Sequence, residues 1–161
     1  MRTLLASVAL IACAACGGEG GRAAPAAEES APAPVASAPD SSSVEAAVAV
    51  LFDYHQAITA RDFERAYRHW GRDGTASGQT LEEFTAGFSR TTRSELVSSV
   101  PGRIEGAAGS RYLDVEVVVE AAAGEPQRFE GTYTLRRVEV DGATPEQHRW
   151  HIESARISGV P

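Results

Sequence analysis

Histidines and a few acidic residues are the side chains best suited to acid–base chemistry in this chain of 161 residues. His55 follows Tyr54 in an apolar helical pattern, and His69 directly precedes Trp70. An imidazole titrates near neutral pH, so it can accept or deliver a proton. Asp73 lies in the polar, Gly-rich segment that follows Trp70. We treat His55, His69 and Asp73 as candidate acids or bases, with a hydrogen-bonded histidine at the edge of the core as the alternative for His55.

Metal and thiol chemistry have less support in the sequence. His148 and His151 are three positions apart on a predicted strand, so they should point to opposite faces and cannot bind one metal as a pair. Both cysteines of the chain, Cys13 and Cys16, lie near the N-terminus, which excludes a thiol nucleophile or a disulfide in the folded region. We expect no metal and no cofactor.

The N-terminal residues predict secretion. Arg2 precedes an apolar segment, residues 3–12, that is too short to span a bilayer as a helix and is typical of a signal peptide. Residues 10–13 resemble the lipobox of bacterial lipoproteins, in which the cysteine receives the lipid. Cys13 has the better leucine spacing, whereas Cys16 gives a more usual signal length and precedes Gly-Gly, so Cys16 is preferred. The alternative is a signal peptide removed at an Ala-x-Ala-like site, or a cytoplasmic protein with an apolar N-terminus.

Composition then divides the chain into three parts. Residues 1–15 are the predicted lipoprotein signal peptide, residues 16–42 a disordered Ala/Pro/Gly/Glu linker, and residues 43–161 one folded domain. Neither Ala14 nor Gly17 is the aspartate that retains many lipoproteins in the inner membrane. We therefore expect a lipid-anchored protein of the bacterial cell envelope, with the outer membrane favoured and the domain facing the periplasm.

The charge of the chain excludes one class of partner. Fifteen basic residues face 22 acidic ones, for a formal net charge of −7, and the arginines are dispersed along the chain. Nucleic-acid binding proteins usually carry a clustered basic surface. We expect no nucleic acid as a partner.

The folded region reads as helices first and strands afterwards. Apolar residues recur at helical spacing over residues 44–60 and 63–70 and again after Thr80, and from residue 94 the period changes to two. Asp62 should cap the second helix and Gly71 should end it. Capping boxes are predicted at Ser42 with Glu45 and at Thr80 with Glu83, and the strands at residues 94–100, 111–121, 128–140 and 147–157.

Strict alternation assigns the two faces of the sheet. The apolar residues predicted to face the helices are Leu113, Val115, Val117 and Val119, and the acidic residues predicted to face solvent are Asp114, Glu116 and Glu120. In the third helix, Leu81, Phe84 and Phe88 are predicted to be buried. The architecture is therefore α+β, with helices on one face of an antiparallel sheet and water on the other.

The ordered set of motifs resembles the nuclear transport factor 2-like (SnoaL-like) cone fold, as found in a branch of bacterial lipoproteins. The motifs that carry the resemblance are Tyr54 and Ile58 before Ala60-Arg61-Asp62, then Ala66-Tyr67, Trp70, Ser77-Gly78-Gln79, Phe84, Gly106-Ala-Ala-Gly-Ser110, Gly131-Thr-Tyr133, Leu135-Arg136-Arg137, Asp141-Gly142 and Arg149-Trp150. The resemblance implies N-terminal helices packed in the concave face of a curved antiparallel sheet, as a cone-shaped α+β barrel, often in a homodimer. Residues expected to line the cone are Tyr54, His55, Tyr67, Trp70, Phe84, Tyr133 and Trp150, although such aromatics more often simply fill a core.

Two functions follow. The first is a membrane-anchored, non-catalytic domain that binds a small apolar ligand or a protein, and we favour it because alternation sends the strand carboxylates to solvent. The second is an isomerase or cyclase of the SnoaL-like type acting on a small apolar substrate, with His55, His69 or Asp73 as acid or base. A buried ionisable group beside a tyrosine in a pocket would favour the enzyme, and a filled interior the binding domain.

Overall fold

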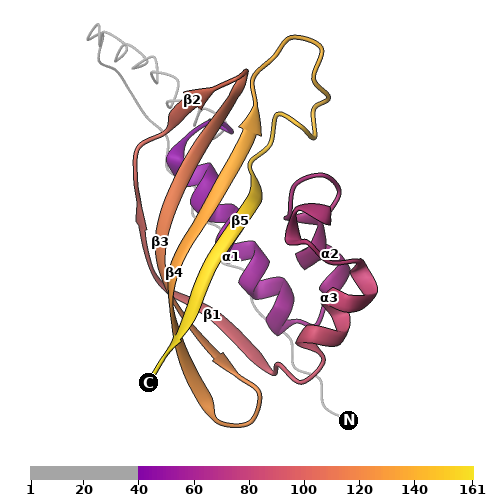
Figure 1. Cartoon of the computed structure of the whole chain (residues 1–161), viewed down its shortest axis with the longest axis vertical. Coiled ribbons are helices and arrows are strands. Elements are labelled where there is room, and N and C mark those ends of the chain that lie inside the picture. The colour runs from indigo at the N-terminus through magenta and orange to yellow at the C-terminus, as the bar shows by residue number, and fades with distance from the viewer. Residues whose placement is uncertain (1–39) are drawn as a thin grey trace, which may run out of the picture. The chain divides into compact units, whose positions relative to one another are not determined.

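Helices precede strands in the described part of the chain, as the sequence predicts. The computed structural model describes residues 40–161, which belong to one compact unit (Figure 1). The predicted signal peptide, the lipidation at Cys13 or Cys16 and nearly all of the linker lie outside the described residues. Within residues 40–161, no helix combines the length and the apolar character that a membrane crossing requires.

The first helix, α1 (Val44–Thr59), begins one residue later than the predicted capping box implies. Ser43 is the N-cap, and its side chain accepts a hydrogen bond from the backbone N–H of Ala46 at 3.1 Å. Ser42 instead donates to the carboxylate of Asp40 through both its backbone N–H and its hydroxyl. The predicted pair of Ser42 with Glu45 is therefore wrong, because Asp40 engages Ser42 in a local turn.

The second helix, α2 (Phe63–Arg68), has the predicted Asp62 cap, whose carboxylate accepts from the N–H of Arg65 at 3.1 Å. The helix ends two residues early because Trp70 leaves it to form a parallel bridge with Ile152. Gly71, predicted to end the helix, does not adopt the left-handed conformation common at helix C-termini. The next three residues, Arg72, Asp73 and Gly74, have positive φ and precede the 3-10 turn η1 (Thr75–Ser77).

The third helix, α3 (Leu81–Phe88), has the predicted capping box of Thr80 with Glu83. Phe84 is buried and Phe88 is half-buried, but Leu81 is exposed, so its predicted burial is wrong. Leu81 is the first residue of the helix, where no neighbouring element covers it.

Five antiparallel strands make one sheet. They are β1 (Arg93–Pro101), β2 (Glu105–Ala107), β3 (Ser110–Ala122), β4 (Pro126–Val138) and β5 (His151–Val160), in the order β1-β3-β4-β5 with β2 also paired to β3. The sequence does not predict β2, whose hairpin to β3 turns through Ala108 and Gly109, both at positive φ. β5 begins at His151 and not at residue 147, because the backbone carbonyl of Gln147 accepts from Val138 in a loop.

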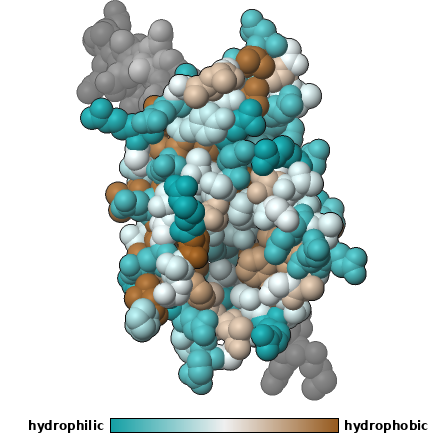
Figure 2. Space-filling model, in the orientation of Figure 1, coloured by the Kyte–Doolittle hydropathy of each residue, from teal (hydrophilic) through white to brown (hydrophobic). Residues whose placement is uncertain are grey.

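Alternation assigns the two faces of the sheet correctly. The four predicted inward residues of β3 are buried and its three acidic residues are exposed. α1 passes behind the strands in Figure 1, and the face visible in Figure 2 mixes many hydrophilic residues with scattered hydrophobic ones. The sheet is not closed into a barrel: β1 and β5 are its two edges, and Trp70 pairs with the edge of β5. The α+β prediction with an antiparallel sheet is confirmed, and the cone shape stays a prediction.

Candidate functional site

Tyr54 is the centre of the aromatic cluster in the interior. Its ring lies 5.0 Å from the imidazole of His55, 6.2 Å from Trp70, 6.5 Å from Phe84 and 6.1 Å from Tyr133, between ring centroids. All five side chains are buried. Edge-to-face and tilted contacts of this kind stabilise a packed aromatic core. The structure therefore brings together most of the residues predicted to line a cone.

These rings pack against one another in the interior. Five depressions occur on residues 40–161, and none of them is lined by Tyr54, Tyr67, Phe84 or Tyr133. Tyr67 packs on Phe84 at 5.5 Å and donates its hydroxyl hydrogen to the carbonyl of Gln79 at 2.8 Å. The core-filling interpretation of these aromatics is the one that the packing supports.

The two tryptophans line different depressions. Trp70 contacts Tyr54 and also walls a depression next to the left-handed residues Arg72 and Asp73. Trp150 is buried beside the N-terminal half of α1, where it lines a different depression. Trp150 belongs to the same buried core as the other aromatic cone candidates, but none of them lines its depression.

His55 joins three elements of the fold. Its Nδ1 atom forms a hydrogen bond of 2.8 Å with the hydroxyl of Ser94 on β1, and its Nε2 atom lies 3.4 Å from the hydroxyl of Tyr133 on β4. Burial lowers the pKa of His55 to about 4, so the imidazole is neutral near pH 7. Burial also raises the pKa of the Tyr54 and Tyr133 hydroxyls above their usual value. The group is a buried, uncharged polar bridge between α1 and the sheet.

Thr59 makes a second connection between α1 and β1. Its hydroxyl donates to the carbonyl of Ser94 at 2.7 Å and accepts from the N–H of Ser94 at 2.8 Å. Both backbone groups of Ser94 are thereby satisfied on the side of the strand that faces α1. Past this point β1 has a bulge between Leu96 and Ser98. The N-terminal half of this edge strand is thus held against the last turns of α1.

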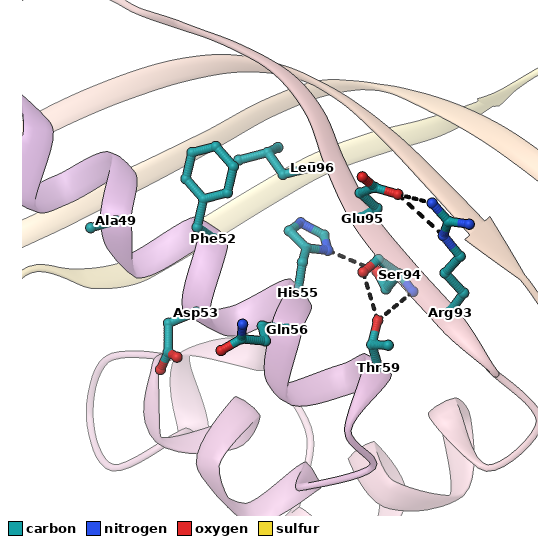
Figure 3. Close-up of a pocket in the computed structure, with 10 residues that line it drawn as sticks. All are labelled: Ala49, Phe52, Asp53, His55, Gln56, Thr59, Arg93, Ser94, Glu95 and Leu96. Atoms are coloured by element: carbon teal, nitrogen blue, oxygen red, sulfur yellow. Dashed lines mark hydrogen bonds and ion pairs between the residues drawn. The ribbon is translucent and has the colours of Figure 1, made fainter.

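A groove of about 570 Å³ runs along this seam (Figure 3). We call it the α1/β1 groove. His55 and Ser94 contribute to its floor, and Phe52 and Leu96 point toward each other across it. The residues that line it are Ala49, Phe52, Asp53, His55, Gln56, Thr59, Arg93, Ser94, Glu95 and Leu96.

Phe52 is the functional candidate that the sequence analysis missed. It is 53% exposed, although large aromatic side chains usually lie inside. Glu45, Ala49 and Gln56 are also exposed and share its spacing of three or four residues, so they form one outward stripe of α1. The signal was present in the sequence: a phenylalanine stands on the polar side of an amphipathic helix.

The other candidate acids and bases lie elsewhere. His69 is half-buried, and its Nε2 atom lies 2.7 Å from the carboxylate of Asp53. Burial lowers the pKa of His69 against the opposing effect of Asp53. Asp73 is exposed and lines the depression beside Trp70. The structure therefore does not unite His55, His69 and Asp73 in one site.

His148 and His151 each bond to a backbone carbonyl. His148 uses Nδ1 toward Val138 at 2.9 Å, and His151 uses Nε2 toward Glu146 at 3.0 Å. His148 lies in a loop before β5, so the premise that both stand on one strand is wrong. In the part of the chain that the structure describes, no three His, Cys, Asp or Glu side chains are grouped as metal ligands would be.

Chemically, the α1/β1 groove presents an exposed aromatic ring over a floor that contains a neutral imidazole and a hydroxyl. Its rim carries Asp53, Arg93 and Glu95, and Arg93 pairs with Glu95 on the same strand. Such a surface can bury an apolar group and bond to polar groups at its edge. Comparison of the chain with protein-family models, with curated proteins and with solved structures found no match.

Proposed function

We propose that the chain is a membrane-anchored lipoprotein of the bacterial cell envelope with a non-catalytic binding domain, and that this domain binds a protein through the α1/β1 groove. The observation that carries the proposal is the exposure of Phe52 at the centre of a groove that has a polar rim. Exposed aromatics ringed by polar residues are typical of protein interfaces.

The packing of the interior supports binding at the surface. A small ligand held inside the domain would need a cavity, and Tyr54, Tyr67, Phe84 and Tyr133 occupy the space that the cone would offer. Pockets for small molecules usually bury most of the ligand. A groove on the outer side of α1 suits a protein surface better.

We also propose the cone-type, nuclear transport factor 2-like relationship for residues 43–161. An open antiparallel sheet with helices on one face is compatible with it, and the motif order supports it. An experimental structure in which the sheet does not curve around α1 would contradict this assignment.

The membrane anchor is tested separately from the groove. Replacing both Cys13 and Cys16 with Ser should release the protein from the membrane fraction, since a lipid chain would be the anchor. A matched variant, Ser37→Cys with both cysteines replaced, should not restore anchoring. If the double variant stays with the membrane after a carbonate wash, lipidation is the wrong explanation.

The binding proposal is tested by a photo-crosslinking residue at Gln56, on the outward stripe of α1 beside Phe52, in the full chain in its native host. Illumination should give a discrete protein adduct. The same residue at Glu82, exposed on α3, is the matched control and should give none. An adduct that also forms at position 82, or no adduct at position 56, contradicts binding through the groove.

A second candidate function, an isomerase or cyclase of the SnoaL-like type acting on a small apolar substrate, has one observation in its favour. His55 is a buried imidazole in contact with Ser94 and near Tyr133, as an acid–base group would be. Under this alternative, His55→Gln should abolish turnover of the substrate even at a temperature where the variant is fully folded, because an amide cannot transfer the proton. A matched variant with no place in that chemistry, Asp73→Asn, should keep the activity. If the His55→Gln variant still turns over the substrate, this alternative is contradicted.

A further inference from the structure

We propose that a second depression beside α1 binds an extended peptide segment through one of its amide groups. We call it the Trp150 depression, and its volume is about 520 Å³. The residues that define it are Ala46, Ala49, Val50, Asp53, His69 and Trp150. Only Ala49 and Asp53 also line the α1/β1 groove, and Figure 3 shows Asp53 pointing from α1 away from Phe52 and Leu96. The site is therefore additional to that groove.

Trp150 offers a hydrogen-bond donor that has no partner. The residue is 3% exposed, and its indole N–H makes no hydrogen bond within residues 40–161. A buried donor that stays unpaired costs free energy, so nearly all such groups in native proteins are bonded. The indole of Trp70 differs, because it lies near the Tyr54 hydroxyl in the core. An acceptor atom of a ligand in the Trp150 depression would satisfy the indole of Trp150.

His69 offers a hydrogen-bond acceptor in the same depression. Its Nε2 atom lies 2.7 Å from the carboxylate of Asp53, which can only accept, so Nε2 carries the proton. Burial lowers the pKa of His69, so the neutral ring prevails near pH 7 and Nδ1 keeps its lone pair. Among residues 40–161, Asp53 is the only hydrogen-bond partner of this ring. The Nδ1 atom is therefore available to a donor on a ligand.

The donor and the acceptor come from adjoining segments. The N–H of Ile152, two residues after Trp150, donates to the backbone carbonyl of His69 at 2.8 Å. Both side chains line the same depression. One donor beside one acceptor matches an amide group, because the amide oxygen accepts and the amide N–H donates. The hydrogen-bonding groups therefore favour an amide as the ligand.

The wall of the depression favours a peptide among the possible amides. Ala46, Ala49 and Val50 give α1 an apolar surface there. The depression is open to solvent, so a bound chain can pass across it. A peptide in an extended conformation presents an amide at each residue, with side chains that can pack on an apolar wall.

Charge around the depression does not favour an ionic ligand. Its two charged pairs are Asp53 with His69 and Arg65, and Arg149 with Glu146. The other charged residue that lines it, Glu45, has a lowered pKa because it accepts hydrogen bonds from its own backbone N–H and from Ser43. The carboxylate of Asp40 lies near Glu45, and Arg111 and Arg137 oppose its charge. These groups are balanced within the chain, which suits a neutral amide.

Nuclear magnetic resonance of the indole groups tests the site in the full chain. The chain has two tryptophans and therefore two indole N–H peaks, which Trp70→Phe and Trp150→Phe identify. The probe is the peptide N-acetyl-Ala-Val-Ala-amide. Its titration should move the Trp150 peak to lower field, with half-saturation at about 0.1 to 1 mM. The Trp70 peak is the internal control and should stay in place. A Trp150 peak that does not move, or two peaks that move alike, overturns the inference.

Two changes test the two hydrogen bonds separately, with ligand-observed resonance as the measurement. Trp150→Phe keeps an aromatic ring but removes the donor, so it should weaken peptide binding about fivefold. An analogue of the peptide with esters in place of its internal amides has no N–H for His69, so it should bind the parent chain more weakly by a similar factor. If the ester analogue binds as tightly as the peptide, or Trp150→Phe as tightly as the parent, the inference is overturned.

Phe52→Ser separates this site from the α1/β1 groove. Phe52 does not line the Trp150 depression, so the variant should bind the peptide as the parent does. A variant that no longer binds the peptide overturns the assignment to the Trp150 depression. The photo-crosslink at position 56 bears on the α1/β1 groove alone, so the two proposals can fail independently.

Discussion

The inner and outer faces of α1 differ in what they contribute to the molecule. Leu51, Tyr54 and Ile58 on the inner face are at most 4% exposed, whereas Phe52 on the outer face is 53% exposed. The inner side chains pack against the sheet and the aromatic cluster, so their burial stabilises the folded domain. Phe52 packs against little within the chain. One helix thus separates the residues that hold the fold from the residues that are free to bind.

His55 lies at the border between these two faces. Its ring is buried with the inner residues, yet it also lines the α1/β1 groove. Because Ser94 and Tyr133 both lie against it, the imidazole ties the helix to two strands. Changes at this position should therefore appear first in stability, and changes at Phe52 should appear first in association.

Trp70→Ala should cause the largest loss of stability. Trp70 is 8% exposed and contacts Tyr54 on the inner face, so its removal empties the core and should cost about 3 to 5 kcal/mol. Its indole N–H lies near the Tyr54 hydroxyl without a hydrogen bond of normal geometry, so the loss is mainly one of packing. Urea unfolding measures the change. A loss below 1 kcal/mol would mean that the inner face does not depend on this ring.

His55 should make the domain sensitive to acid. Its pKa is lowered from 6.5 to about 4 in the fold, so the unfolded chain binds the proton more readily. The corresponding stability is fully present above pH 6.5 and is lost as pH falls toward 4, to a total of about 3 kcal/mol at 1.4 kcal/mol per pH unit. His55→Gln, which does not titrate, should flatten the curve of unfolding free energy against pH over this range. Equal slopes for the two proteins would contradict the prediction.

Asp62→Ala should have a smaller effect. The carboxylate caps α2 at the corner that follows α1, and losing such a cap costs about 1 kcal/mol. Asp62→Asn keeps a hydrogen-bond acceptor and serves as the matched control, and it should lose only a few tenths of a kcal/mol of stability. Thermal unfolding of the three proteins would rank them, and an Asn variant as unstable as the Ala variant would show that charge, and not capping, is what matters.

Phe52→Ser should leave the stability nearly unchanged. An exposed aromatic contributes little to folding, so the change should stay within about 0.5 kcal/mol. The same variant should lose the crosslink at position 56. Val140→Ser, at another exposed apolar residue, is the control and should keep the crosslink. A large loss of stability in Phe52→Ser would remove the distinction between the two faces.

Local patterns predicted the parts of the fold that local interactions decide. The Asp62 cap, the capping box at Thr80 and the alternation along β3 all involve residues within a few positions of one another, and all three are confirmed. The predicted C-terminal end of α2 is wrong because a tertiary contact sets it. Trp70 leaves α2 to pair with Ile152, which is more than eighty residues away in the chain, and no local pattern could reveal that.

The same distinction between local pattern and tertiary contact applies to the candidate site. The sequence determined that His55 belongs to the buried side of a helix, because Tyr54 and Ile58 set the helical period around it. Only the tertiary structure decided that Ser94 and Tyr133 meet its two ring nitrogens, since these residues come from separate strands. The helical period also places Phe52 on the polar side of α1, but only the tertiary structure decided that β1 lies beside it and forms a groove. Periodicity says which residues share a face of a helix, but the partner that covers that face is set by packing between distant segments.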